Sequence, residues 1–386
     1  MEAKFFPLRL PGMILFGCGA VNKIGEEAKV LGAKRVLIVC DPGIASTGMV
    51  DAVKAILEKS GLTVGVFSEV VPEPPVETLE PCVEMARKGG YDLVVGLGGG
   101  SSMDAAKVVS VMAVHPGKIE DLFGTDKVPG RGLPMIMVPT TSGTGSEATV
   151  NSILTDTKSQ VKKGIVSRHL MPDVAIVDPE MTLSCPPKVS AASGMDTLTH
   201  AIESYVSVKA TPETRLFALE AIRLCARHLR TAVLNGANIR GREGMSRASL
   251  YAGISISNAG TALVHAMAYP LGAQFHTPHG VSNALLLPYV MEFNYLGDLE
   301  LFADIAEAMG EPLAGLSARQ KAEAAVRAVR QMSIDIGIPQ RLSEVGVTES
   351  SLATMADDAI EIRRLLDNNP RSVTRDDIYQ IYRAAF

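Results

Sequence analysis

The chain has 386 residues, a length typical of two domains. Apolar residues make up 47% of it and charged residues 20%, a composition that can bury a large core and that excludes a disordered chain. The 42 acidic residues outnumber the 37 basic ones, which argues against binding to nucleic acid or to an anionic membrane surface.

The beginning of the chain shows no sign of a targeting segment. Residues 1–7 lack the apolar core and the small-residue cleavage site of a signal peptide. No apolar run approaches the roughly 18 residues that suggest a membrane-spanning helix. The five cysteines are odd in number and form no CxxC pair, so neither a disulfide framework nor a thiolate zinc site is expected. We therefore expect a cytoplasmic protein.

The first half of the chain alternates between predicted strands and helices. Short runs rich in β-branched residues predict strands at 35–40, 62–67, 93–97, 135–138 and 174–177. Helical patterns occur between the first of them, at 46–60 and 76–88. Strands that alternate with helices of this length predict βαβ units and a mostly parallel, Rossmann-like sheet.

The pattern changes after residue 180. The pair Pro186 and Pro187 is a plausible start for a second domain. Apolar residues then recur at helical spacing, with no convincing strand, at 212–233, 241–257, 298–309, 318–336 and 375–385. We predict an α/β dinucleotide-binding domain over 1–180 and an all-α domain for metal and substrate over 181–386.

A glycine-rich turn follows the strand at 93–97. It reads Gly98, Gly99, Gly100 and Ser101, and a helical run comes directly after it. Glycines allow a ligand to approach the backbone closely, and the first turn of a helix offers unpaired N–H groups to a phosphate. The turn is not GxGxxG, so the ordinary Rossmann fingerprint is absent, and a tight structural turn is the alternative.

The next predicted strand, 135–138, also ends in a polar loop, at 139–147. Ligands of open α/β sheets lie at the carboxyl ends of the strands, so two such loops predict a nucleotide site. Asp41 ends the first strand, where a carboxylate can bind an adenosine ribose and repel a 2′-phosphate. This favours NAD over NADP, although Asp41 can equally be a turn residue before Pro42.

Histidines and one aspartate form a possible metal site in the second half. Asp196 and His200 are spaced i, i+4 on a predicted helix, His265 lies in an apolar helical stretch, and His276 and His279 lie in a predicted turn. One carboxylate with two or three imidazoles can hold Fe²⁺ or Zn²⁺. Spacing alone leaves a plain alternative, namely an ordinary polar contact on the helix and a core histidine.

Four motifs in this order resemble the iron-dependent (group III) alcohol dehydrogenases, which are related in fold to glycerol dehydrogenase and dehydroquinate synthase. They are the segments 98–101, 139–147, 194–203, and 265–268 with 278–280. The resemblance implies four metal ligands, Asp196, His200, His265 and His279. It implies that the turn from Gly98 to Ser101 holds the pyrophosphate and that Asp41 lies at the adenosine ribose. It further places these residues along the cofactor: Thr140, Thr141, Thr144, Asn151, Lys162 and Leu183.

Two positions depart from the family pattern. Many members carry a histidine where this chain has Tyr269, and an asparagine is common where it has His276. The usual proton relay is therefore in question. Tyr269 or His276 can replace it, solvent can suffice, or both residues can simply shape the pocket.

The resemblance implies reversible hydride transfer between NAD(H) and a small alcohol, aldehyde or ketone, with the metal polarising the substrate oxygen, in a homodimer or larger assembly. The alternative is a lyase or cyclase that uses NAD transiently, as dehydroquinate synthase does. Such an enzyme needs lysines and arginines to grip a phosphorylated acid, yet 193–203 and 258–285 contain neither. A non-catalytic NAD-binding module is a third possibility, against which the complete ligand set argues.

Overall fold

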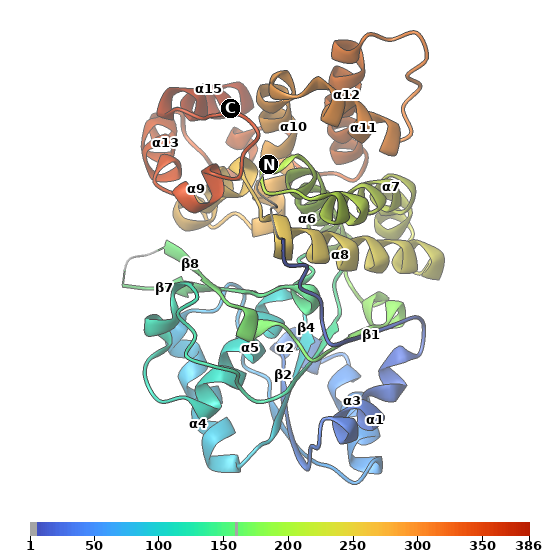
Figure 1. The fold of residues 1–386 in the computed structure, drawn as a ribbon, viewed down its shortest axis with the longest axis vertical. Helices are drawn as coiled ribbons and strands as arrows, with labels where there is room; N and C mark the ends of the chain where they lie inside the picture. Colours follow the sequence, from blue (N-terminus) through green and yellow to red (C-terminus); the bar gives the residue numbers. More distant parts are fainter. Residues whose placement is uncertain (1–5, 159–160) are drawn as a thin grey trace. The chain divides into compact units, whose positions relative to one another are not determined.

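The computed structural model describes residues 6–158 and 161–386, which form two compact units (Figure 1). One unit contains Arg9–Thr141 and Gly145–Cys185, and the other contains Ser142–Thr144 and Pro186–Phe386 with the described residues before Arg9. The chain passes from the first to the second at the proline pair singled out in the sequence. The domain boundary after residue 180 stays a prediction.

The first unit is built on a six-stranded parallel sheet with the strand order β1-β9-β6-β4-β2-β3. The predicted α/β fold with a parallel sheet is confirmed, and so are its five predicted strands. The sequence pattern missed the short edge strand β1. The strands are β1 Met13–Phe16, β2 Arg35–Val39, β3 Thr63–Phe67, β4 Leu93–Gly98, β6 Met135–Pro139 and β9 Val174–Val177.

Helices bury both faces of this sheet. Alternate residues of β2 belong to different cores: Val36 and Ile38 pack with α1 (Ile24–Val30) and α3 (Met49–Lys59). Leu37 and Val39 pack with α4 (Val76–Gly89) and α5 (Gly100–Val114). A strand buried on both faces reads as a continuous apolar run, which is why β2 was predictable. The short helix α2 (Pro42–Ala45) follows β2.

A second, three-stranded sheet was not predicted. It consists of β5 (Gly124–Thr125), β8 (Val161–Val166) and β7 (Asn151–Asp156), in that order, and β7 pairs antiparallel with β8. Half of β8 is polar or glycine, so local apolar content did not reveal it. Short 3-10 turns complete this unit: η1 Ala20–Lys23, η2 Ile119–Leu122, η3 Ser146–Ala148, η4 Arg168–Leu170 and η5 Pro179–Thr182.

From Pro186 onward, the described residues of the second unit form helices and 3-10 turns joined by loops, with no strand among them, which confirms the predicted all-α half. Its first five helices are α6 Pro187–Val206, α7 Pro212–Leu234, α8 Ile239–Ala259, α9 Leu263–Phe275 and α10 His279–Asn294. They are followed by α11 Leu299–Ala308, α12 Ala318–Asp335, α13 Leu352–Ile360, α14 Arg363–Leu366 and α15 Arg375–Ala385, with the turns η6 Tyr295–Gly297, η7 Leu342–Val345 and η8 Glu349–Ser351. One apolar core joins α6, α9 and α10.

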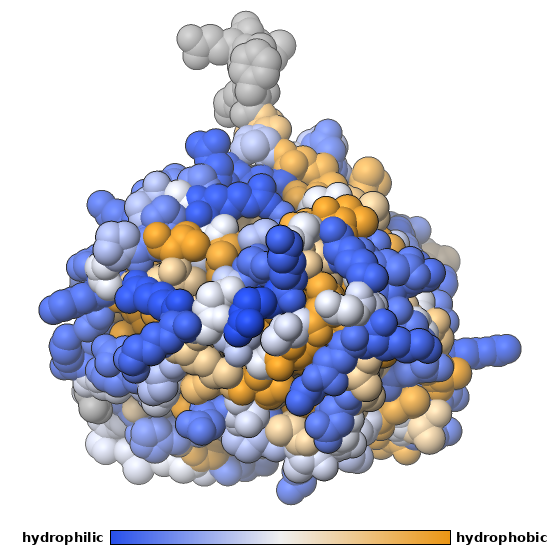
Figure 2. Space-filling model, turned by 90° about the horizontal axis from the view of Figure 1, so that it is seen from below, coloured by the Kyte–Doolittle hydropathy of each residue, from blue (hydrophilic) through white to orange (hydrophobic). Residues whose placement is uncertain are grey.

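Hydrophilic side chains are interspersed with separate apolar areas on the face shown in Figure 2. Among the described residues, no helix is both long enough and apolar enough to cross a membrane.

Candidate functional site

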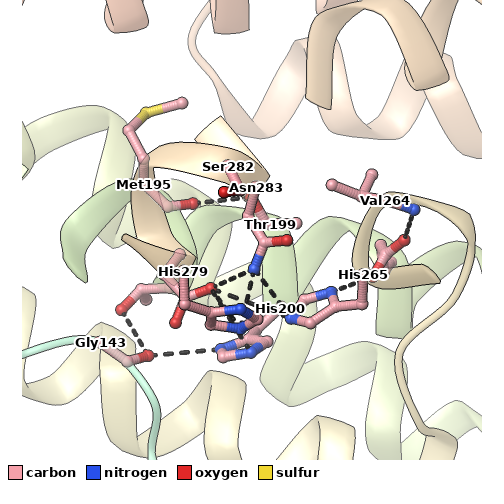
Figure 3. Close-up of polar contacts among 12 residues, drawn as sticks. Gly143, Met195, Thr199, His200, Val264, His265, His279, Ser282 and Asn283 are labelled. Atoms are coloured by element: carbon pink, nitrogen blue, oxygen red, sulfur yellow. Dashed lines mark hydrogen bonds and ion pairs between the residues drawn. The ribbon is translucent and has the colours of Figure 1, made fainter. Parts of the chain in front are cut away.

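Four predicted metal ligands lie together in the helical unit. Asp196 and His200 share one face of α6 because they are four residues apart, while His265 lies on α9 and His279 is the first residue of α10. The Nε2 atoms of the three histidines lie 3.8, 3.9 and 3.8 Å from Oδ1 of Asp196, in chain order (Figure 3). Asp196, His265 and His279 each offer a ligand atom, all within 4.8 Å of one another.

The rings of His200 and His265 stack at 4.8 Å between centroids, with 18° between their planes. Nδ1 of His200 lies 3.3 Å from the carbonyl oxygen of Gly143, so it carries the proton and leaves the Nε2 lone pair facing the cluster. Burial lowers the pKa of His200, and the nearby Asp196 carboxylate only partly opposes this effect. His200 is therefore a neutral imidazole, the form that binds a metal.

Glu203, which was not among the site residues predicted from the sequence, orients the second histidine. Its carboxylate accepts hydrogen bonds from Nδ1 of His265 at 2.6 Å and from the backbone N–H groups of Ala262 and Val264 at 2.9 and 2.6 Å. It thereby holds the start of α9 and places the free Nε2 lone pair of His265 toward the cluster. A sequence signal existed, since Glu203 follows Asp196 by two helical turns on the same face of α6.

Asn283 is a second functional candidate that was not predicted from the sequence. Its Nδ2 donates to Oδ1 of Asp196 at 2.7 Å and lies 3.1 Å from the Nε2 atoms of both His265 and His279. Its carbonyl Oδ1 is buried and has no hydrogen-bond partner among the described residues.

The cluster has the chemistry of a divalent-cation site. Burial alone would raise the pKa of Asp196, but the three histidines and the Asn283 amide outweigh it and hold the pKa below its usual range. Asp196 is therefore an anion. A carboxylate oxygen with imidazole nitrogens directed at one point is a donor set that fits Fe²⁺ or Zn²⁺. The residues present thus fit the metal that the motifs imply.

In the α/β unit the glycine turn forms the start of α5, earlier than the sequence suggested. Gly98 ends β4 with a positive φ of 149°, and Gly99 is the N-cap of α5. The N–H of Thr140 donates to the carbonyl of Gly98 at 3.0 Å, so the two polar loops adjoin at one sheet edge. A Cβ on Gly99 would lie 3.5 Å from Oγ1 of Thr141. The first N–H groups of α5, from Gly100 onward, are available to a ligand.

Asp41 has a structural role at the same edge. Its Oδ1 accepts from the N–H of Ile44, which caps α2, and its Oδ2 accepts from the hydroxyl of Ser102 at 3.2 Å. This supports the turn interpretation of Asp41. Its interaction with a ribose stays a prediction.

Two further predicted cofactor residues lie close together because both contact Glu73. Nζ of Lys162 forms an ion pair with the carboxylate of Glu73 at 2.5 Å. The hydroxyl of Ser101 accepts a hydrogen bond from the backbone N–H of Glu73 at 3.1 Å. Asn151 instead uses its carbonyl to bind Nζ of Lys107, at 2.8 Å. Leu183 ends the 3-10 turn η5 and is 40% exposed, and Thr144 belongs to the helical unit.

A buried charged network lies beneath the polar loop. The Nζ of Lys107 also contacts the carbonyl and hydroxyl of Thr149, at 2.9 and 3.0 Å. Burial lowers the pKa of Lys107 to about 8, despite the nearby carboxylates of Asp104 and Glu147. Burial likewise raises the pKa of Glu147 to about 7. Neither carboxylate oxygen of Glu147 has a hydrogen-bond partner among the described residues.

The two proton-relay candidates lie in different surroundings. The ring of Tyr269 is 6.5 Å from the ring of His279, centroid to centroid, so Tyr269 lies beside the cluster. His276 is exposed and ends α9 with a left-handed backbone at φ 53°. None of the contacts seen among the described residues joins His276 to the four predicted metal ligands.

Family comparison agrees with this combination of a parallel sheet and a histidine cluster. Residues 11–179 match the model of the iron-containing alcohol dehydrogenases, and residues 190–386 match the C-terminal model of the Fe-containing alcohol dehydrogenase family. The chain belongs to the iron-containing alcohol dehydrogenase family and is an oxidoreductase that acts on alcohols or aldehydes. The resemblance found in the sequence is confirmed.

Individual relatives are similar over nearly their whole length. Long-chain-alcohol dehydrogenase 1 of Geobacillus thermodenitrificans is 46% identical, over 97% of this chain and 95% of the relative. NAD-dependent methanol dehydrogenase of Bacillus methanolicus is 38% identical, over 97% of this chain and 98% of the relative. A crystal structure of 1,3-propanediol oxidoreductase has a TM-score of 0.97 at 40% identity, covering 99% of this chain and all of the other.

Proposed function

We propose that this protein transfers a hydride reversibly between NAD(H) and a small uncharged alcohol or its aldehyde, with Fe²⁺ or Zn²⁺ held by Asp196, His200, His265 and His279. The observation that carries the proposal is that the Nε2 atoms of three histidines lie within 3.9 Å of one carboxylate oxygen, with the ligand atoms of Asp196, His265 and His279 within 4.8 Å of one another. Such an ion, when bound, would supply Lewis acidity toward the substrate oxygen.

The chain's own residues prepare that chemistry. Glu203 accepts a hydrogen bond from Nδ1 of His265, and the carbonyl of Gly143 accepts one from Nδ1 of His200. In both rings the Nε2 lone pair is left free for the ion. Gly98, Gly99, Gly100 and Ser101 would bind the pyrophosphate of the dinucleotide at the first turn of α5. The nicotinamide carries the redox chemistry, and the protein supplies orientation and charge.

The preference for NAD over NADP rests on Asp41. Its carboxylate lies beside the start of α5, where it would repel a 2′-phosphate. The relative from Bacillus methanolicus is described as NAD-dependent, which supports the same choice. The cofactor contacts of Thr140, Thr141, Thr144, Asn151, Lys162 and Leu183 belong to the proposal.

The substrate class follows from charge. The stretches 193–203 and 258–285, which carry the metal cluster, contain no lysine or arginine, so an uncharged substrate is favoured over a phosphorylated acid. Three of the similar proteins are named for a long-chain alcohol, methanol and 1,3-propanediol, which are uncharged. Another, from Bilophila wadsworthia at 36% identity, is named for sulfoacetaldehyde, which is an anion, so the preference for an uncharged substrate rests on the composition of the two stretches. Tyr269, beside His279, and His276 are the candidates for the proton relay. A homodimer and a cytoplasmic location are part of the same proposal.

The test uses metal-stripped protein reloaded with Fe²⁺, Zn²⁺ or Co²⁺, assayed with a panel of alcohols and aldehydes and with both dinucleotides. We expect net NADH to accumulate with an uncharged alcohol, whereas the lyase alternative would turn over without net NADH. His265→Ala should lose both metal and turnover, and His169→Ala, on η4, should keep both. Full NADH-linked turnover by metal-free His265→Ala would refute the mechanism.

A further inference from the structure

Asn283 lies where the proposed ligands converge. It follows His279 by one turn on α10, and its side chain is fully buried. Figure 3 shows its amide pointing at the cluster, with Nδ2 at 2.7 Å from Oδ1 of Asp196 and at 3.1 Å from Nε2 of both His265 and His279. The amide nitrogen thus faces one carboxylate oxygen and two imidazole nitrogens.

These three atoms are the ones that a cation would use. A neutral imidazole has a single acceptor lone pair, and in His265 the Nδ1–H is donated to Glu203, so that lone pair is at Nε2. One lone pair cannot accept an amide N–H and bind a cation at the same time. The positive end of the amide dipole would also be repelled by a divalent ion. Amide and ion therefore exclude each other at His265.

The other end of the side chain shows what selects this orientation. Oδ1 of Asn283 is buried without a hydrogen-bond partner among the described residues, an arrangement that carries a desolvation cost. Because the carbonyl makes no hydrogen bond, the contacts of Nδ2 determine the orientation of the amide. Asn283 is thus held by the cluster itself.

We propose that Asn283 is a placeholder for the metal: its amide satisfies the ligand atoms of the metal-free protein and must give them up when the ion enters. Asn283 then lowers the metal affinity by stabilising the metal-free state more than the loaded state. This inference rests on the proposed metal site. It makes Asn283 a positioning residue that acts through Asp196, His265 and His279.

The experiment measures Zn²⁺ affinity by chelator competition on the stripped full-length protein, at one pH, for wild type and Asn283→Ala. We expect the variant to bind Zn²⁺ about tenfold more tightly, which corresponds to ~1.4 kcal/mol. Its thermal midpoint should fall more in the metal-free form than in the loaded form. Asn283→Ser keeps one hydroxyl hydrogen, so it should raise the Zn²⁺ affinity by a smaller factor. If the alanine variant does not fold, the serine variant tests whether Asn283 lowers the metal affinity.

Asn294→Ala is the matched control. Asn294 is a buried asparagine on the same helix, and it exchanges two hydrogen bonds of 2.8 Å with Asn369. Its removal should lower both thermal midpoints equally and leave the Zn²⁺ affinity unchanged. An Asn283→Ala affinity that is unchanged or weaker would overturn the placeholder. Failure of wild type itself to bind Zn²⁺ or Fe²⁺ would instead overturn the proposed metal site.

Discussion

Replacing Glu203 with glutamine tests the site most directly, because one carboxylate serves three donors. Ala262 and Val264 are the N-cap and second residue of α9, so two of the three hydrogen bonds satisfy the start of that helix. The third orients His265. In Glu203→Gln the amide oxygen can still accept from Val264, but the NH₂ group must then face two N–H donors.

One way for the variant to relieve the conflict at His265 is to move a proton on that imidazole ring. If Nδ1 becomes the acceptor of the new NH₂ group, the proton moves to Nε2 and the lone pair facing the cluster is lost. Removing the partner of a ligating histidine typically costs 10- to 100-fold in metal affinity, and we expect a loss of about this size. Loss of two charge-assisted hydrogen bonds should also cost ~3–5 kcal/mol of unfolding free energy.

Two measurements check the prediction: chelator competition for Zn²⁺ affinity, and denaturant unfolding of the metal-free protein. Glu243→Gln is the control, since Glu243 on α8 is 44% exposed and pairs only at the surface with Arg247, where a loss below ~0.5 kcal/mol is expected. A Glu203→Gln variant that retains wild-type Zn²⁺ affinity to within twofold would refute the orienting role of Glu203. A loss of stability without a loss of Zn²⁺ affinity would show that Glu203 only caps the start of α9.

Three further predictions concern the α/β unit. Asp41→Ser should raise kcat/KM for NADP⁺ relative to NAD⁺ by at least ~10-fold in steady-state assays, and an unchanged ratio would remove Asp41 from the cofactor site. Gly98→Ala should lower the free energy of unfolding by ~2 kcal/mol, because Gly98 has a positive φ and a Cβ there would lie 2.6 Å from Oγ of Ser102. Gly99→Ala has neither problem, so its free energy of unfolding should stay within ~1 kcal/mol of wild type. Glu147 takes up a proton on folding between pH 4.5 and about 7, so its contribution to stability is present below pH 4.5 and is lost as the pH rises through 7. In urea titrations, Glu147→Gln should therefore gain up to ~3 kcal/mol over wild type between pH 5 and 8, and parallel pH profiles would contradict the raised pKa.

The local sequence determined the architecture because its signals act within one element. β2 and β4 are buried on both faces, so they appear as continuous apolar runs. Helices such as α7 show their apolar stripe at helical spacing, and Thr211 marks its N-cap. The i, i+4 spacing of Asp196 and His200 likewise requires only the geometry of one helix.

Only the tertiary structure decided which groups complete the site. Glu203 meets His265 across 62 positions, and Asn283 meets Asp196 across 87, distances over which no periodicity connects two residues. Asp41 is similar, since its bond to Ser102 spans 61 positions and shows that it fastens two helices. A hydrogen bond depends on the relative placement of whole helices, and that placement comes from the packing of many side chains together, so motif residues could be predicted singly while their partners could not.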